Sequence, residues 1–187
     1  MATHTDHSKN YGIYFITFTC CKWRPLFEEV NLYSYFNKWF EYLKKMQADL
    51  VGYIIMPNHF HALIHVSEIC DASLNKLVSN GKRFLAYEII SRLKQKGNTK
   101  ELFLLANEVS SSERLKGKQH EVFKLSFDAK FCYSREMIEK KLDYIHQNPV
   151  SGKWELVNNW VDYPYSSAKF YELGTSHPYL VHYMDLI

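Results

Sequence analysis

Two short apolar runs separated by four residues predict a β-hairpin in the first third of the chain. Residues 51–55 and 60–66 have the length and the β-branched and aromatic content of strands. Met56, Pro57 and Asn58 lie between them and favour a tight Pro-Asn turn. We therefore expect a buried hairpin here.

Strand and helix patterns alternate on both sides of this hairpin. Apolar spacing, N-cap residues and breakers predict strands at 12–20 and 121–133, and helices at 30–46, from 71 or 73 to 96, and at 134–148. The resulting order, β-α-β-β-α-β-α, predicts an α+β fold with a mainly antiparallel sheet and packed helices, of the ferredoxin-like or RNA-recognition kind. We expect strain in the long helix near Asn80 and Gly81, and an exposed loop over residues 100–120.

The length of 187 residues, with 47% hydrophobic residues, suits one domain. We expect residues 1–10 to be a flexible N-terminus and residues 11–187 to form the domain, with an aromatic C-terminal extension from about residue 151 that packs back onto it. No apolar run approaches the roughly 18 residues of a membrane span, and residues 1–10 lack a signal h-region. A cytoplasmic protein is expected, and its four cysteines show no metal-binding spacing.

The hairpin also carries a histidine pair with the geometry of a metal site. Side chains alternate along a strand, so His59 and His61 point to one face with Cα atoms about 6–7 Å apart. His65 shares that face but lies about 13 Å from His61, too far to join the same ion. Nine His in the chain give roughly 0.4 such pairs by chance, so the pair alone is weak evidence. Two imidazoles suit Zn²⁺ as well as Mn²⁺.

A second polar pair follows on the predicted helix at 134–148. Ile138, Leu142 and Ile145 form its apolar stripe, and Tyr144 and Asn148 lie together, four residues apart, along the edge of that stripe. This helix therefore offers a phenol and an amide oxygen to an ion at the histidines. The alternative from periodicity alone is a boundary tyrosine and a helix-terminal asparagine before Pro149.

Three motifs occur in a fixed order along the chain: Met-Pro-Asn-His-Phe-His-Ala-Leu-Ile at 56–64, Leu-Asp-Tyr-Ile-His-Gln-Asn-Pro-Val at 142–150 and Tyr-Pro-Tyr-Ser-Ser-Ala at 163–168. In order and spacing they resemble the REP-associated tyrosine transposases, single-tyrosine members of the HUH endonuclease superfamily, over residues 11–171. The resemblance implies an enzyme that cleaves and rejoins single-stranded DNA at hairpins through a 5′-phosphotyrosine. It implies His59 and His61 as metal ligands, Asn148 as the third ligand, Tyr144 as nucleophile, and Mg²⁺ or Mn²⁺ as cofactor. Related enzymes act as monomers or as helix-swapped homodimers.

The positive charge of the chain is concentrated in one segment. The net charge is only +3, yet residues 76–118 hold ten Lys or Arg against four Glu. Such enrichment is typical of a solvated helix face or of a polyanion-binding surface. The candidate nucleic-acid-binding residues are Lys76, Lys82, Arg83, Arg92 and Lys94.

Two other functions fit the same residues. One is an HUH replication initiator or relaxase that uses the same histidine pair, although such proteins usually carry further domains. The other is a catalytically silent module that binds single-stranded nucleic acid, with histidines and tyrosines stacking on bases. Metal dependence separates the silent module from the enzymes.

Overall fold

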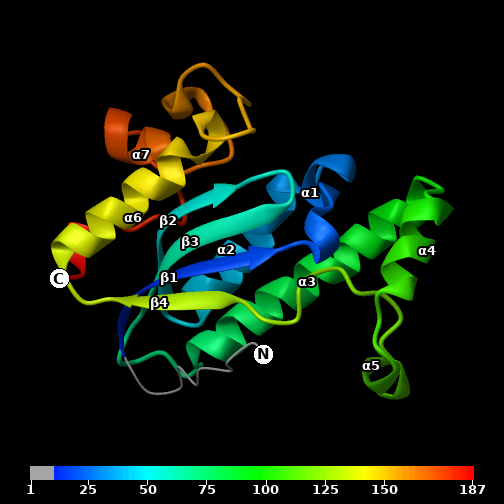
Figure 1. The fold of residues 1–187 in the computed structure, drawn as a ribbon. Coiled ribbons are helices and arrows are strands. Elements are labelled where there is room, and N and C mark those ends of the chain that lie inside the picture. The colour runs from blue at the N-terminus through cyan, green and yellow to red at the C-terminus, as the bar shows by residue number, and fades with distance from the viewer. Residues whose placement is uncertain (1–10) are drawn as a thin grey trace.

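The computed structural model describes residues 11–187, so the expected flexible segment 1–10 lies outside the described part. The centre of the fold is a four-stranded antiparallel sheet in the order β2-β3-β1-β4 (Figure 1). The strands are β1 (Gly12–Thr19), β2 (Ala48–Ile55), β3 (His59–Val66) and β4 (Asp128–Cys132). This is the strand order of a ferredoxin-like sheet, and the predicted α+β fold is confirmed.

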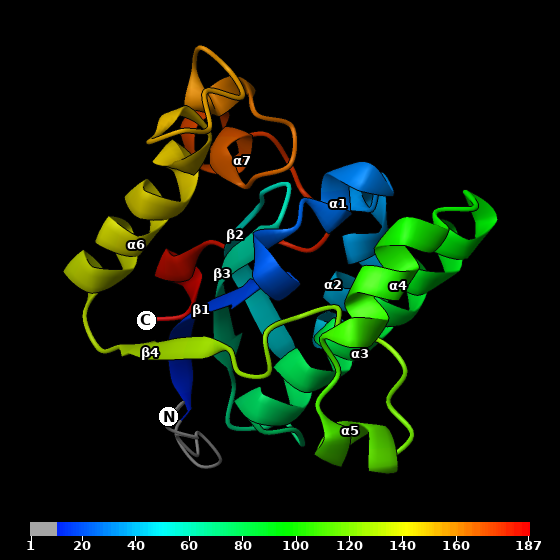
Figure 2. The ribbon, with the colours of Figure 1, turned by 45° about the vertical axis from the view of Figure 1, so that its right-hand side comes forward.

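Helices cover the two faces of the sheet unequally. Helices α2 (Phe36–Lys45) and α3 (Leu74–Gln95) pack on one face, whereas α6 (Arg135–Gln147) packs on the other (Figure 2). The shorter helices are α1 (Leu26–Glu29), α4 (Thr99–Asn107), α5 (Ser111–Leu115) and α7 (Ala168–Leu173). Short 3₁₀ turns occur at Cys21–Trp23, Tyr33–Tyr35, Asn148–Val150, Trp160–Asp162 and Tyr183–Asp185.

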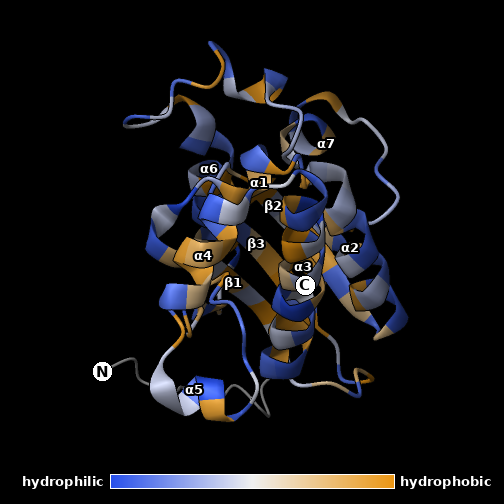
Figure 3. Ribbon diagram, turned by 90° about the vertical axis from the view of Figure 1, so that its right-hand side faces the viewer, coloured by the Kyte–Doolittle hydropathy of each residue, from blue (hydrophilic) through white to orange (hydrophobic). Residues whose placement is uncertain are grey.

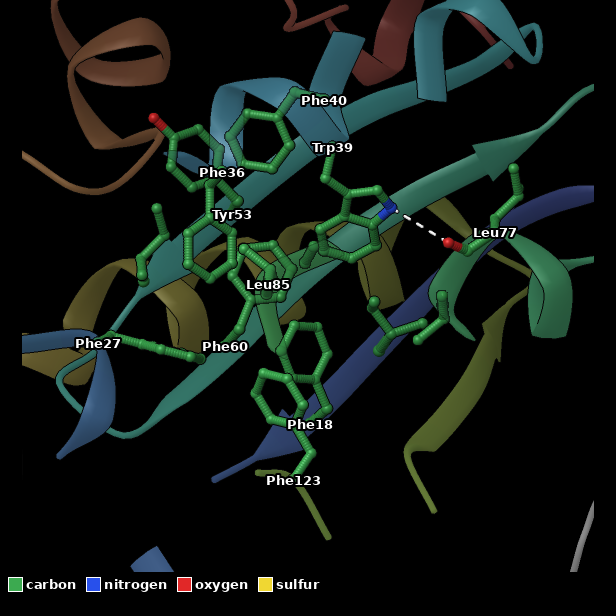
Figure 4. Close-up of a cluster of buried hydrophobic side chains, with 14 of the residues drawn as sticks. Phe18, Phe27, Phe36, Trp39, Phe40, Tyr53, Phe60, Leu77, Leu85 and Phe123 are labelled. Atoms are coloured by element: carbon green, nitrogen blue, oxygen red, sulfur yellow. Dashed lines mark hydrogen bonds between the residues drawn. The ribbon is translucent and has the colours of Figure 1, made fainter. Parts of the chain in front are cut away.

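The larger core lies between the sheet and α2 and α3. Alternate residues of β1 and β3 face this side, among them Phe18 and Phe60, whose rings are 5.1 Å apart (Figure 4). Trp39 of α2 is fully buried and its indole N–H donates to the carbonyl of Leu77 at 3.1 Å. Helix α3 is amphipathic, with polar residues on its outer side (Figure 3). Burial on this face fixes α2 and α3 and leaves the other face to α6.

The expectation of strain near Asn80 and Gly81 is wrong, because α3 runs without a break from Leu74 to Gln95. Gly81 lies against the ring of Trp39, where a Cβ atom would be 2.2 Å from the nearest ring carbon. The glycine therefore lets α2 and α3 approach closely.

Three other expectations need correction. The helix expected at 30–46 begins at Phe36 after a 3₁₀ turn, and the strand expected at 121–133 is regular only over Asp128–Cys132. The expected loop at 100–120 contains most of α4 and all of α5. The side chains of Asn98 and Ser110 cap these helices by accepting from the backbone N–H groups of Glu101 and Glu113. Both caps have the capping-box spacing, a signal that the polar composition of the segment obscured.

The C-terminal extension packs along β2. Isolated bridges join Leu50 to Leu180 and Ile54 to Ser166, and the Tyr171 hydroxyl donates to the carbonyl of Val51 at 2.8 Å. Within residues 11–187, no helix has the length and apolar character needed to cross a membrane.

Candidate active site beside the central strands

The two predicted histidines lie on the α6 side of β3, close to the turn that precedes this strand. His61 pairs with Thr17 of β1 and His59 with Thr19. Their ring centroids are 4.9 Å apart, and each residue is 5% exposed. The alternation of the strand therefore brings both imidazoles together, and His65 is held apart by a hydrogen bond to Asp49.

Neighbouring side chains fix the orientation of both rings. His59 Nδ1 lies 2.7 Å from the Asn58 amide oxygen, and His61 Nδ1 lies 2.6 Å from the Thr17 hydroxyl. These contacts engage the Nδ1 atoms and leave the Nε2 atoms for the site. Hydrogen bonding of the distal ring nitrogen is what holds metal-binding histidines in a fixed orientation.

Burial keeps the two imidazoles neutral. Desolvation lowers the pKa of His59 to about 4 and that of His61 to about 3. The positive charges of Lys153 and Lys141 add to the lowering at His59 and His61, respectively. At neutral pH both rings are thus in the unprotonated form that coordinates a metal.

Helix α6 delivers the phenol and the amide. The Tyr144 ring centroid is 5.3 Å from that of His61, and Tyr144 is 51% exposed. Asn148, just past the end of α6, makes a side-chain hydrogen bond with His59. The Ser134 cap and the buried Ile138, Leu142 and Ile145 place the helix in this register. All four predicted site residues therefore meet at one place.

A buried hydrogen bond joins two of the sequence motifs. His146 Nε2 lies 2.8 Å from the Ser167 hydroxyl, which also accepts from the Tyr53 N–H at 3.0 Å. Burial lowers the pKa of His146 to about 4. This contact ties α6 to the C-terminal extension and to β2. Sequence reasoning missed it, because nothing local to either residue marks the pairing.

The site opens into a cavity of about 720 Å³ lined by His59, His61, Tyr144 and Asn148. Residues from distant segments complete the lining, and sequence reasoning did not place them there: Trp23, Lys124, Lys153 and Trp154. Asp128 begins β4 opposite Thr17 and also lines the cavity. Periodicity could not locate these residues, because they come together only through the sheet.

The basic residues of α3 lie on the opposite side of the sheet from the histidines. Lys82 Nζ donates to the carbonyls of Lys124, Leu125 and Ser126, the nearest at 2.7 Å, and burial lowers the pKa of Lys82 to about 8. Arg92 donates to the Val30 carbonyl at 3.2 Å and to Glu88. The exposed candidates of this group are Lys76, Arg83 and Lys94.

A second cavity, of about 1150 Å³, lies between α3 and residues 117–129. It shares Lys124, Ser126, Phe127 and Asp128 with the lining of the histidine cavity. Residues 124–128 therefore separate the basic helix from the candidate site.

The donor set fits a divalent ion. Within residues 11–187, no three His, Cys, Asp or Glu side chains cluster as a metal site. A metal here depends on the two imidazoles and the amide oxygen of Asn148, whose side chain hydrogen-bonds to His59. Two neutral, oriented imidazoles suit Zn²⁺ as well as Mn²⁺, and an amide oxygen beside them favours a harder ion.

The comparisons with known proteins show the fold. No family model and no curated protein sequence matches the chain. It is similar to a solved structure described as a REP-associated tyrosine transposase bound to a REP hairpin, with a TM-score of 0.60 and 14% identity, over 97% of this chain and 92% of that chain. At that identity the similarity concerns architecture, and the chain has the α+β fold of that transposase structure.

Proposed function

We propose that this protein is a metal-dependent single-stranded DNA transposase or endonuclease of the HUH type, which acts at DNA hairpins through a 5′-phosphotyrosine. The observation that carries the proposal is the meeting of two neutral imidazoles, Asn148 and the half-exposed Tyr144 in one cavity. The structural neighbour, a transposase bound to a REP hairpin, supports the choice of DNA hairpin as partner.

In the proposed reaction the Tyr144 oxygen forms a bond to phosphorus as the bond from phosphorus to the 3′-oxygen breaks. The hydroxyl proton of Tyr144 leaves, and the departing 3′-oxygen gains a proton to become a free 3′-OH. The phosphate stays linked to Tyr144 and to the 5′-oxygen of the nucleotide that follows the cut. Because this link retains the energy of the phosphodiester, reversal joins strands without ATP.

The residues around Tyr144 serve this step in different ways. His59, His61 and Asn148 would hold Mg²⁺ or Mn²⁺. A bound ion would stabilise negative charge on a non-bridging phosphate oxygen as a Lewis acid. Asn58 and Thr17 orient the imidazoles, and α6 fixes the phenol beside them. The exposed Lys76, Arg83 and Lys94 of α3 remain candidates for contacts with the phosphates of a hairpin stem.

The test is covalent capture of DNA. The protein is incubated with a labelled DNA hairpin that carries an unpaired arm, in Mn²⁺, and a denaturing gel is examined for a protein-DNA adduct. We expect an adduct with wild type and none with Tyr144→Phe, which keeps the packing but cannot attack phosphorus. Tyr133→Phe is the matched control, because Tyr133 is 80% exposed and precedes α6.

Two results would contradict the proposal. One is a wild-type protein that binds the hairpin equally well with and without divalent ions and forms no adduct, which would favour a silent binding module. The other is an adduct whose peptide map places the nucleotide on a tyrosine other than Tyr144. Tyr163 is a poor candidate, because it is buried and its hydroxyl donates to the Ile55 carbonyl at 2.9 Å.

A further inference from the structure

Four lysines on the α6 side of the sheet, at or near the candidate site, have unpaired ammonium groups. Lys124 and Lys153 line the cavity beside the histidines. Lys141 lies one turn before Tyr144 on α6, and Lys130 lies on β4 opposite Phe15, whose ring packs on the α6 side of the sheet. Within residues 11–187 none of the four side chains has a hydrogen-bond acceptor or a carboxylate partner.

Three of these lysines lie over aromatic rings at the site. Lys124 Nζ is 4.4 Å from the ring centroid of Trp23, and Lys153 Nζ is 5.3 Å from that of Trp154. Lys141 Nζ is 4.3 Å from the Phe15 centroid and 5.5 Å from that of Tyr144. Trp23 and Trp154 each lie 5.9 Å from His59, on the wall of the cavity. Cations interleaved with aromatic rings are typical of surfaces that bind single-stranded nucleic acid.

Several lysines elsewhere on the chain form ion pairs or donate to backbone carbonyls. On α6 itself, Lys140 forms an ion pair with Glu136 at 2.7 Å. Lys116 and Lys118 pair with Glu113 and Glu121, and Lys82 is satisfied by backbone carbonyls. An unpaired ammonium keeps its full charge available for an incoming phosphate, whereas a paired one must first break its own contact. Exposed lysines with no ion pair within residues 11–187 also occur on other surfaces, such as Lys45 of α2. The lysines around the cavity are set apart because three of them lie over aromatic rings at the site.

We propose that Lys124, Lys130, Lys141 and Lys153 form a phosphate-binding track that holds the unpaired arm of single-stranded DNA across the histidines and Tyr144. The track deepens the proposed function, on which it rests, by placing the substrate strand on the α6 side of the sheet. Bases of the arm stack on Trp23 and Trp154 at the Asn148 end of the site. The exposed cations of α3 lie on the other side of residues 124–128 and do not touch this arm.

The experiment measures binding without catalysis. Fluorescence titrations with oligothymidylate in EDTA give the dependence of affinity on salt for wild type and for Lys→Met variants at each track position. Each phosphate contact to a single strand contributes roughly 0.7 to the slope of log affinity against log salt. We expect each variant to reduce the slope by about that amount and the fourfold variant to reduce it by roughly 3. Binding should also quench tryptophan fluorescence, and Trp23→Phe with Trp154→Phe should remove most of the quenching.

Two matched controls come from the same chain. Lys140→Met removes a paired lysine next to Lys141, and Lys45→Met removes an exposed cation of α2, on the other face of the sheet. Both should leave the slope for oligothymidylate unchanged. Unchanged slopes in the track variants, or a loss with Lys45→Met alone, would overturn the track.

The outcome is separable from that of the proposed function. If wild type forms the Tyr144 adduct but the track variants bind like wild type, the track is wrong and the transposase proposal stands. If the track variants reduce the slope of log affinity against log salt while no hairpin yields an adduct, the track is supported as a binding site and the cleavage proposal fails.

Discussion

The two faces of the central sheet draw on the same strands for different purposes. Toward α2 and α3, β3 contributes Phe60, Ala62 and Ile64, all fully buried in an apolar core. Toward α6 the same strand contributes His59 and His61, which border a cavity. Because side chains alternate, one step along the backbone moves from the packed core to the site. Around Phe60 the packed core and the candidate site are therefore separated residue by residue, whereas Leu63 of the same strand is buried in a second apolar cluster toward α6. Changes at Phe60 and at the histidines should have different consequences.

The neighbours Phe60 and His61 offer the strongest test of this separation. Phe60 lies 5.0 Å from Phe36, 5.1 Å from Phe18 and 5.3 Å from Trp39, measured between ring centroids. We expect Phe60→Ala to reduce the free energy of unfolding by about 3–5 kcal/mol, because it leaves a cavity in the core. His61→Ala should reduce it by about 1 kcal/mol, because water from the adjoining cavity can replace the ring.

Urea denaturation gives the free energy of unfolding of both variants, and calorimetry measures their binding of Mn²⁺. His61→Ala should fold and lose the ion, whereas any folded Phe60→Ala protein should retain it. Equal destabilisation by the two variants would show that the faces are not energetically distinct.

Gly81 tests how closely the core face is packed. An added methyl group would meet the ring of Trp39 at 2.2 Å, far inside contact distance. Overpacking of this kind costs about 3 kcal/mol, and replacing a helical glycine recovers about 1 kcal/mol. We therefore expect Gly81→Ala to lower the free energy of unfolding by about 2 kcal/mol. The control is Ser79→Ala at an exposed position of the same helix, which should be neutral or slightly stabilising; a stabilised Gly81→Ala protein would mean that Trp39 moves freely.

How far the sequence predicts each face follows from this arrangement. The apolar spacing of β3 and of the helices is a local signal, so the sheet, α6 and the meeting of His59, His61, Tyr144 and Asn148 could be anticipated from periodicity and motif. The role of Gly81 could not, because its partner Trp39 is on another helix. Lys124, Asp128 and Trp154 reach the cavity only through strand order and the path of the C-terminal extension, which no local pattern encodes.

Lowering the pH should reduce the free energy of unfolding through His61, on the α6 side of the sheet. The pKa of His61 is about 3 in the folded protein, below the ordinary value of 6.5, so the folded state disfavours its protonation. The contribution of His61 to stability is therefore complete above about pH 6.5 and is lost as the pH falls toward the folded pKa. At pH 5 the loss is about 2 kcal/mol for one such histidine.

Urea denaturation at pH 7 and pH 5 in EDTA measures this loss. The difference between the two free energies should be smaller by about 2 kcal/mol in His61→Ala than in wild type. If His61→Ala retains the full pH dependence, another group is responsible.

The smallest effect should come from Thr17, because its side chain contacts His61 and would affect the proposed ion only indirectly. Its hydroxyl lies 2.6 Å from His61 Nδ1, and valine keeps its shape without that contact. Loss of such an orienting partner weakens metal binding by about tenfold or more, so we expect Thr17→Val to bind Mn²⁺ about tenfold more weakly at nearly unchanged stability. Thr19→Val is the control, because Thr19 lies on the same face of β1, opposite His59, and within residues 11–187 its side chain makes no hydrogen bond. Equal weakening by both variants would mean that the general polarity of β1 matters and that the bond to Nδ1 does not. Selective weakening by Thr17→Val would show that the chemistry of the α6 face depends on a ring orientation set within the sheet.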